Sequence, residues 1–335
     1  MTPVLNPTLL IDRFGRTVDY LRISITDRCD FRCVYCMAEE MTFLPRAHVL
    51  SLEEIESLAQ AFVELGVKKI RITGGEPLVR KGALELLTQI GHLDGLEELV
   101  ITTNGSQLET MAPALKAAQV KRINISLDTL DADKFKAITR TGDLSQVLRG
   151  IQAAKAEGFD RIKLNAVILK GRNHLEVNEL VQFAVDNEID ISFIEEMPLG
   201  VVEQHDRADA YYSSAAIKAD LEPHFTLIRT LEKTGGPSNY FNVVGTKTRV
   251  GFISPHSDNF CSTCNRVRLT VEGRLLLCLG NEHSVDLKAV LREHPGDMAL
   301  LKQAIIDAML IKPEKHEFNI NEQPVILRYM NMTGG

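Results

Sequence analysis

Hydrophobic and polar residues alternate in six short runs within the first 200 residues, and longer amphipathic runs separate them. A period of two is typical of strands, and apolar spacings of three and four are typical of helices. The stretch 51–66 opens with Ser51 and Glu54 in capping-box spacing and ends at a glycine, which predicts a helix. The six expected strands are 19–26, 68–73, 97–103, 121–128, 161–168 and 190–197, and the other expected helices are 82–93, 107–119, a stretch across 131–157, and 174–187.

This strand–helix alternation predicts βαβ units around a parallel sheet, and hence an α/β fold. Six units fall short of the eight that close a TIM barrel, so we expect an incomplete (β/α)6 TIM-like barrel, with an open doubly wound sheet as the alternative. From about residue 200 the alternation stops, and turn-rich segments precede further helical patterns. We therefore expect two domains, residues 1–200 with the partial barrel and residues 201–335 as a C-terminal α+β domain.

Polar residues gather on one face of several expected strands, near their C-terminal ends. Successive side chains of a strand point to opposite sides, so residues two apart share a face. The sets that share a face are Arg71 with Thr73, Thr102 with Asn104, Asn124 with Ser126 and Asp128, and Lys163 with Asn165. Contact with solvent or helix ends explains any one of these faces. Four together favour a polar cavity at the end of the sheet where α/β active sites lie.

The composition is that of a globular protein, with 335 residues of which 44% are hydrophobic and 25% are charged. The net charge of -7 argues against nucleic acid and membrane partners, so any cations that hold an anionic substrate must be local. The N-terminal residues show no signal-peptide pattern, and no apolar run approaches the about 18 residues of a membrane span. We expect a cytoplasmic protein, in which thiols stay reduced.

The six cysteines form two groups of three, Cys29, Cys33 and Cys36 in C-x3-C-x2-C spacing and Cys261, Cys264 and Cys278 in C-x2-C-x13-C spacing. Disulfides fit the even total but not the odd number in each group or the missing export signal. Structural zinc takes four ligands, and His256 and His283 keep that reading open for the second group. A 4Fe–4S cluster held by three thiolates leaves one iron open to another ligand.

Two shorter motifs add candidate chemistry. In TGGEP (73–77), Gly74 and Gly75 permit close backbone approach, and Glu76 offers an acceptor to an ammonium group, although a plain turn explains the motif equally well. Arg266 and Arg268 share a face of an expected strand beside the second cysteines, which suits phosphate; a solvated surface strand is the alternative.

Two further features have ordinary explanations. Lys68 and Lys69 precede Arg71 in a small basic group, and we expect both lysines to be solvated. The chain ends in Gly334–Gly335, and chain ends are usually frayed.

The first cysteine motif, with Tyr35 before its last cysteine, resembles that of the radical S-adenosylmethionine (SAM) enzymes, and TGGEP resembles their methionine-binding motif. CSTCNRVRL, Cys278 and the terminal Gly-Gly resemble the GTP 3′,8-cyclase family of molybdenum cofactor biosynthesis. The resemblance covers nearly the whole chain.

The resemblance implies a lyase that converts GTP to (8S)-3′,8-cyclo-7,8-dihydroguanosine 5′-triphosphate, the first step of molybdenum cofactor biosynthesis. It implies two 4Fe–4S clusters, each on three cysteines. The open iron of the first binds SAM, and that of the second, in the C-terminal domain, binds the guanine ring of GTP. An electron cleaves SAM to a 5′-deoxyadenosyl radical, which abstracts the ribose H3′, and the C3′ radical then attacks guanine C8.

The resemblance also implies roles for individual residues. SAM-binding positions are Tyr35, Gly75, Ser126 and Met197; GTP-binding positions are Arg22, Arg71, Thr102, Lys163, Arg266, Val267 and Arg268; and the Gly334–Gly335 tail enters the active site. Strand alternation marks Arg71, Thr102, Ser126 and Lys163 as inward without reference to any family. The implied partners are GTP, a reducing protein as electron donor and a downstream cyclic pyranopterin monophosphate synthase, with the chain a monomer or homodimer.

Two other functions compete with this reading. One is a different radical SAM enzyme, such as a peptide maturase, whose C-terminal cysteines bind an auxiliary cluster away from the substrate. The other is a zinc-stapled binding module without enzyme activity.

Overall fold

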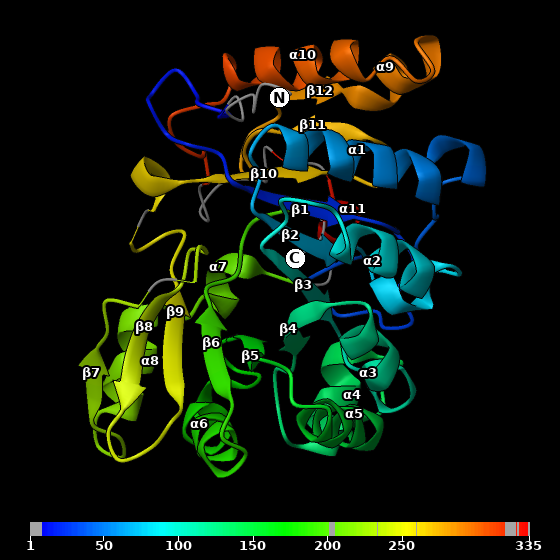
Figure 1. Cartoon of the computed structure of the whole chain (residues 1–335). Helices are drawn as coiled ribbons and strands as arrows, with labels where there is room; N and C mark the ends of the chain where they lie inside the picture. Colours follow the sequence, from blue (N-terminus) through cyan, green and yellow to red (C-terminus); the bar gives the residue numbers. More distant parts are fainter. Residues whose placement is uncertain are drawn as a thin grey trace.

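A twelve-stranded sheet forms the centre of the computed structural model, which describes residues 9–200, 205–232, 234–258, 260–318, 326 and 328–333 (Figure 1). The strand order is β12-β11-β10-β1-β2-β3-β4-β5-β6-β9-β8-β7. The eight adjacent strands from β10 to β9 run parallel, and the outer strands pair antiparallel. The strands are β1 (Tyr20–Ser24), β2 (Lys69–Thr73), β3 (Glu98–Thr103), β4 (Val120–Ser126), β5 (Arg161–Val167), β6 (Asp190–Ile194), β7 (Leu227–Arg229), β8 (Asn239–Val243), β9 (Arg249–Ile253), β10 (Arg266–Leu269), β11 (Arg274–Leu276) and β12 (Ser284–Asp286).

Helices cover the outer face of strands β1 to β6 (Figure 1). The predicted capping box is present at the first of them, since Glu54 N donates to Ser51 Oγ at 3.1 Å and Ser51 N donates to Glu54 Oε2 at 2.7 Å. The helices that follow the strands are α1 (Leu52–Glu64), α2 (Ala83–Gly91), α3 (Leu108–Ala117), α4 (Ala132–Thr139), α5 (Leu144–Ala156) and α6 (Val177–Asp186), with short 3-10 helices η1 (Arg46–His48), η2 (Pro77–Val79) and η3 (His174–Glu176).

The six strands predicted for the first 200 residues are present, each within three residues of its predicted ends. The stretch 131–157 holds two helices because it contains two N-caps. Asp131 Oδ1 accepts from the backbone N–H of Asp133 at 2.9 Å, and Asp143 Oδ1 accepts from that of Ser145 at 2.9 Å. A second capping carboxylate within the stretch starts a second helix.

The residues beyond 200 extend the parallel sheet at both ends. β9 lies beside β6, and β10 lies beside β1, so the C-terminal part of the chain closes around both sides of the polar face. The helices of this part are α7 (Arg207–Ala210), α8 (Ser214–Leu221), η4 (Cys261–Thr263), α9 (Leu287–Glu293), α10 (Met298–Met309) and α11 (Met330–Thr333).

The two faces of the sheet differ in chemistry, as the alternation predicts. Ile23, Ile72 and Ile101 are fully buried and belong to the apolar core beneath the helices. Their strand neighbours Arg22 and Arg71 point the other way, into a cavity described below. Among the described residues, no helix has both the length and the apolar character needed to cross a membrane.

Candidate functional site

The first cysteine group lies on the loop after β1, where its three thiols are free and partly buried. The backbone N–H of Phe31 donates to Cys29 Sγ at 3.4 Å, and that of Asn331 donates to the thiol of Cys36. Burial raises the pKa of Cys29 and Cys33 above the ordinary range and that of Cys36 to about 12. Such thiols become thiolates only beside added positive charge, which the irons of a cluster would supply.

The cysteine loop is fixed to its surroundings from two sides. Asp30 Oδ1 accepts from Asn104 Nδ2 at 2.6 Å, and its Oδ2 accepts from Ser106 Oγ at 2.6 Å, which ties the loop to the end of β3. On the other side, a Cβ added to Gly75 would lie 2.3 Å from the carbonyl oxygen of Arg28. The close approach of these two backbones therefore requires glycine at position 75.

Glu76 in the same turn is fully buried, and its acceptors are occupied by protein donors. Oε1 accepts from Leu78 N at 3.0 Å and Thr103 Oγ1 at 2.8 Å, and Oε2 accepts from Asn104 N at 2.6 Å. Burial raises the pKa of this carboxyl to about 7. These contacts support a structural role, the alignment of the TGGEP turn with the end of β3.

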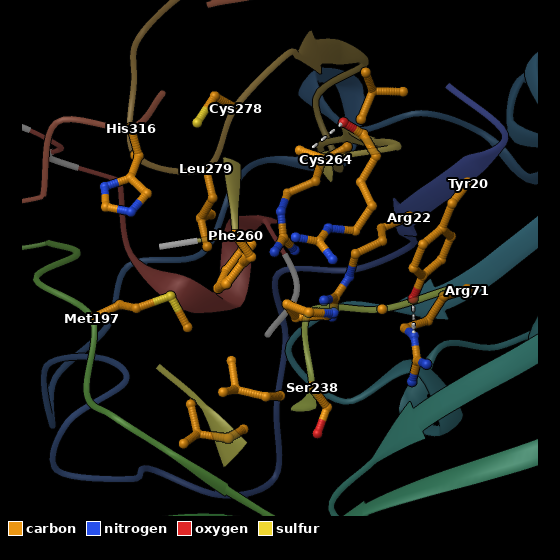
Figure 2. A pocket seen from close by; sticks show the side chains of 18 of the residues that line it. Tyr20, Arg22, Arg71, Met197, Ser238, Phe260, Cys264, Cys278, Leu279 and His316 are labelled. Carbon is orange, nitrogen blue, oxygen red and sulfur yellow. Dashed lines mark hydrogen bonds between the residues drawn. The ribbon is translucent and has the colours of Figure 1, made fainter. Parts of the chain in front are cut away.

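A cavity opens on the polar face of the sheet, and Figure 2 shows Cys264 and Cys278 above it, Tyr20 and Arg71 to the right and Met197 to the left. The space between its walls is about 1060 Å³, open solvent at the mouth included. The polar side chains that line it are Tyr20, Arg22, Arg71, Thr102, Asn124, Lys163, Asn165, Thr234, Ser238, Arg266, Arg268 and His316, together with all three cysteines of the second group.

Five of the lining side chains are cations, and no Asp or Glu is among the described lining residues. Strand register brings three of them into one row, since Arg268 of β10 lies opposite Arg22 of β1, which in turn lies opposite Arg71 of β2. A second row across β3, β4 and β5 aligns Thr102, Asn124 and Lys163. This charge distribution favours an anionic ligand.

The charges in the cavity act strongly on one another. Burial and the neighbouring Arg268 lower the pKa of Arg22 well below its ordinary value, and burial with Arg266 lowers that of Arg268 to about 10. Burial alone would raise the pKa of Tyr20, but Arg71, which donates from Nε to the Tyr20 hydroxyl, and other nearby cations outweigh burial and lower it to about 7. Among the described lining residues, the cavity therefore gathers positive charge with no Asp or Glu beside it.

Two buried nitrogen atoms on the cavity wall lack a hydrogen-bond partner within the described part of the chain: Arg22 Nε and His316 Nε2. Buried polar groups are almost always paired in folded proteins. Both atoms therefore fit a bound ligand that supplies acceptors.

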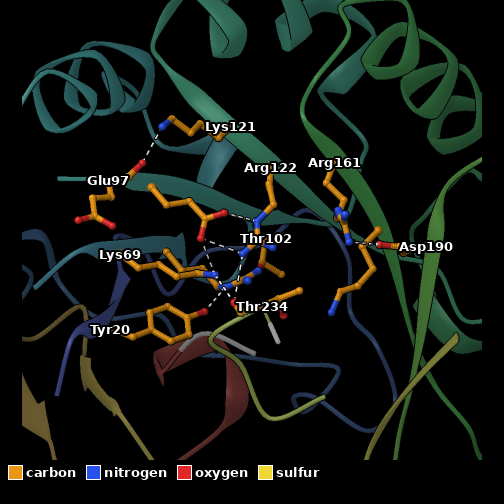
Figure 3. A network of polar contacts seen from close by, with 12 residues as sticks. Tyr20, Lys69, Glu97, Thr102, Lys121, Arg122, Arg161, Asp190 and Thr234 are labelled. Carbon is orange, nitrogen blue, oxygen red and sulfur yellow. Dashed lines mark hydrogen bonds and ion pairs between the residues drawn. The ribbon is translucent and has the colours of Figure 1, made fainter. Parts of the chain in front are cut away.

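Outside the cavity, the neighbouring cations are neutralised by carboxylates, and Figure 3 shows this network, including the ion pair of Arg161 with Asp190. Lys69 pairs with Glu98 at 2.7 Å and donates to the Thr234 carbonyl oxygen at 2.8 Å. Lys69 is only 8% exposed, so the prediction that it is solvated is wrong. It shares its strand face with Arg71, whereas Lys68 points outward and is exposed, as predicted.

The second cysteine group carries its own basic neighbours. Arg16 Nη1 donates to the Cys261 carbonyl oxygen at 2.8 Å, and Lys312 Nζ lies 3.7 Å from Cys264 Sγ. Burial would raise the pKa of Cys264, but Arg266 and Lys312 overcome it and hold that pKa below its ordinary value. Burial raises the pKa of Cys278. This donor set, three thiols beside several cations, fits an anionic iron–sulfur cluster.

The C-terminal helix α11 connects the two cysteine groups. Met330 lines the cavity that contains the second group, and the backbone N–H of the next residue, Asn331, bonds to the thiol of Cys36 in the first. Asn331 Nδ2 also donates to the Asp27 carbonyl oxygen at 2.8 Å. Gly334 and Gly335 lie outside the described residues.

Comparison with known proteins matches residues 23–184 to the Radical SAM superfamily and residues 189–318 to Molybdenum Cofactor Synthesis C. The GTP 3′,8-cyclase of Pseudomonas entomophila is 62% identical over 98% of this chain and 99% of its own length, and that of Marinobacter nauticus is 62% identical with the same shares. The chain belongs to the GTP 3′,8-cyclase family. The solved structure of Streptococcus suis SuiB shares its fold, with a TM-score of 0.64 over 96% of this chain and 79% of SuiB at 16% identity.

In this GTP 3′,8-cyclase family member, the structure brings together the residues predicted to bind GTP. Arg22, Arg71, Thr102, Lys163, Arg266, Val267 and Arg268 all line the cavity. The positions predicted to bind SAM do not all line this cavity. Met197 lines the cavity, Ser126 ends β4, Gly75 packs on the first cysteine loop, and Tyr35 donates from its hydroxyl to Asp128 Oδ2 at 2.7 Å. The ligand that each residue touches stays a prediction.

Sequence reasoning missed several residues of this GTP 3′,8-cyclase site. Tyr20 carried a usable signal, because it lies two residues before Arg22 on the same strand and must share its face. His316 and Lys312 carried none, since they lie in irregular chain between α10 and α11. Only tertiary folding brings them to the second cysteines.

Proposed function

We propose that this chain is a GTP 3′,8-cyclase that converts GTP to (8S)-3′,8-cyclo-7,8-dihydroguanosine 5′-triphosphate in molybdenum cofactor biosynthesis. The observation that carries the proposal is the cavity with five cations, no described carboxylate in its lining and the second cysteine group in its wall. A triphosphate would bring negative charge to these cations, and a guanine ring joined to it would meet the cysteines in the wall of the same cavity.

The cysteines would hold two 4Fe–4S clusters, Cys29, Cys33 and Cys36 the first, and Cys261, Cys264 and Cys278 the second. When bound, the first cluster and SAM would supply the one-electron chemistry, a 5′-deoxyadenosyl radical, for abstraction of the ribose H3′ and closure of the bond from C3′ to guanine C8. The chain positions these groups and keeps water away. Partly buried thiols with N–H donors to sulfur support cluster binding at the first site.

Separate sets of side chains would hold the two small molecules. The amine and carboxylate of SAM would reach the first cluster beside Tyr35, Gly75, Ser126 and Met197. The arginines of β1, β2 and β10 would bind phosphate oxygens, because a guanidinium offers planar paired donors to them. Lys163 and Thr102 lie on the second polar row and would contact the nucleoside part.

The proposal also includes the domain boundaries of the chain, its partner proteins and the place where it acts. We assign residues 1–200 to an incomplete (β/α)6 TIM-like barrel and 201–335 to a C-terminal α+β domain, a division supported by the separate matches to residues 23–184 and 189–318. A reducing protein would donate the electron, and cyclic pyranopterin monophosphate synthase would take the product. The chain would act in the cytoplasm, where thiols stay reduced, as a monomer or homodimer.

Isotope transfer tests the reaction directly. The anaerobic protein with both clusters is incubated with reductant, SAM and GTP carrying deuterium at C3′, and the released 5′-deoxyadenosine is analysed by mass spectrometry. We expect one deuterium in 5′-deoxyadenosine, matched by cyclised product. GTP with deuterium at C8 serves as the matched control and should transfer none. Unlabelled 5′-deoxyadenosine from the C3′-deuterated substrate would exclude the proposed abstraction.

The Gly334–Gly335 tail would enter the active site. This proposal is supported by α11, which ends just before the tail and contacts both the first cysteine loop and the cavity. Removal of Gly335 should abolish turnover while both clusters remain, as measured by iron content and product formation. Unchanged turnover would reject the role.

A further inference from the structure

Lys312 is a buried lysine in the described part of the chain without a carboxylate contact. It lies just beyond α10 and is 1% exposed. Its ammonium group donates to the Leu277 carbonyl oxygen at 2.7 Å and to the Arg266 carbonyl oxygen at 3.1 Å, and it lies 3.7 Å from Cys264 Sγ. Among the described residues, these two carbonyls and one sulfur are the acceptors of its three N–H groups.

A buried ammonium group requires compensation for the hydration that it loses. Two neutral carbonyl oxygens supply part of it, and an ordinary protein core would supply a carboxylate for the rest. The remaining contact of Lys312 is the sulfur of Cys264, which is a proposed cluster ligand. Three thiolates exceed the charge of an oxidised 4Fe–4S core, so the complete assembly is an anion, and reduction makes it more negative.

Arg16 provides a contrast on the same cysteine group. Its Nε pairs with Asp12 Oδ2 at 2.6 Å, so its charge is already neutralised within the protein. Its Nη atoms donate to the carbonyl oxygens of Cys261, Pro313 and Glu314 at 2.6 to 2.8 Å. Arg16 thus joins the cysteine loop to the residues that directly follow Lys312, and it fixes the lysine in place. Of these two cations, only Lys312 lacks a carboxylate contact within the described residues.

We propose that Lys312 is the buried counter-ion of the second cluster, a positioning residue that donates to Cys264 and stabilises the reduced, more negative form. Lys312 is not among the residues that line the cavity, so it acts through the cysteine and not on the substrate. Hydrogen bonds to the sulfur ligands and local charge set the potentials of such clusters. The inference rests on the proposed function in requiring that the second cysteine group hold a cluster and, for the test, that GTP bind beside this cluster and SAM beside the first.

The test replaces Lys312 in the full-length protein with both clusters. Lys312→Met removes the charge and the donors, whereas Lys312→Gln removes the charge and keeps a donor. Lys302→Met is the matched control, because Lys302 lies on the surface of α10 and pairs with Glu64 at 2.9 Å. Iron and sulfide are measured for each protein, and midpoint potentials follow from redox titration monitored by electron paramagnetic resonance. The signal that changes on addition of GTP identifies the second cluster, and the signal that changes on addition of SAM identifies the first.

We expect both Lys312 variants to disfavour reduction of the second cluster about tenfold, a decrease of about 59 mV for one electron, with the first cluster unchanged. Selective loss of the second cluster's iron from both variants would also support the counter-ion role. A wild-type potential in Lys312→Gln would overturn it, because the charge would then be dispensable. Failure of both variants to fold would overturn it too, since Lys312 would then serve packing. Absence of a second cluster from the wild type would instead refute the proposed function.

Discussion

Arg268→Met removes one of the five cavity cations while it keeps an unbranched, apolar stem. Arg268 lies opposite Arg22 in the register of β10 and β1, beside Arg266 on its own strand. The substitution should therefore have two opposite effects. It would remove the proposed contact to phosphate, which weakens binding of GTP, and it would relieve repulsion from Arg266 and Arg22, which stabilises the ligand-free protein.

The size of the expected loss in GTP affinity follows from the kind of contact proposed, a charged hydrogen bond from Arg268 to phosphate. A hydrogen bond that involves charged groups contributes about 1.5–3 kcal/mol, which corresponds to about 10- to 150-fold in affinity. Arg22 and Arg71 lie in the same row and would still be available to the phosphates of a bound GTP. Their attraction also grows when a neighbouring like charge is removed. We therefore expect the lower end of the range, about tenfold weaker binding of GTP.

The gain in stability follows from the pKa of Arg268. Burial and Arg266 lower this pKa from 12.5 to about 10, so the charged form is disfavoured in the folded state. A difference of this size corresponds to at most about 3 kcal/mol at neutral pH, and solvent screening of the partly exposed side chain reduces it to about 1 kcal/mol. Because the folded pKa of a base is lowered, the cost is present at all pH values below about 10 and fades above.

Equilibrium binding of GTP to the anaerobic protein and thermal unfolding of the ligand-free protein measure the two effects. Arg149→Met is the control, because Arg149 lies on the exposed side of α5 and pairs with Glu109 at 2.9 Å. We expect it to leave both quantities unchanged. Affinity of Arg268→Met within twofold of wild type would refute the assignment of the cavity to GTP, and a lower unfolding temperature would refute the repulsion argument.

Three further changes test other parts of the site. The lowered pKa of Tyr20 predicts that its tyrosinate absorbance appears near pH 7. The contribution of this group to stability should be present above pH 10 and lost as the pH falls through about 7. The absorbance change should vanish in Tyr20→Phe and move to higher pH with GTP bound. Gly75→Ala would push against the Arg28 carbonyl oxygen at 2.3 Å, so the protein should lose the first cluster and retain about four of about eight irons per chain; full iron content would contradict this. Asn331→Ala removes the bond to the Asp27 carbonyl oxygen, and turnover should fall at least about tenfold while GTP affinity stays unchanged; equal losses in both would show a general structural effect.

Local patterns predicted the strands and the polar face because both depend on backbone periodicity. Arg71, Thr102 and Lys163 could be placed in one cavity from alternation alone, since neighbouring parallel strands align their side chains. The buried state of Lys69 follows from the same alternation, because Lys69 shares a strand face with Arg71. Lys312 was not predictable, because its contacts join residues 35 to 48 positions apart and no local pattern encodes them.

Among the described residues of the cavity, Arg71 contacts the hydroxyl of Tyr20 and not a carboxylate, which suits a site that binds an anion. A carboxylate in its place would neutralise the arginine permanently and would compete with every phosphate that approached. The nearby cations outweigh burial and lower the pKa of Tyr20 to about 7, so its hydroxyl would offset part of their charge and could take up a proton if a phosphate bound. Lys69 and Arg122 do not line this cavity, and both pair with the carboxylate of Glu98. Carboxylates outside the cavity and a tyrosine inside it therefore compensate the charge of the buried cations and leave the cavity open to an anionic ligand.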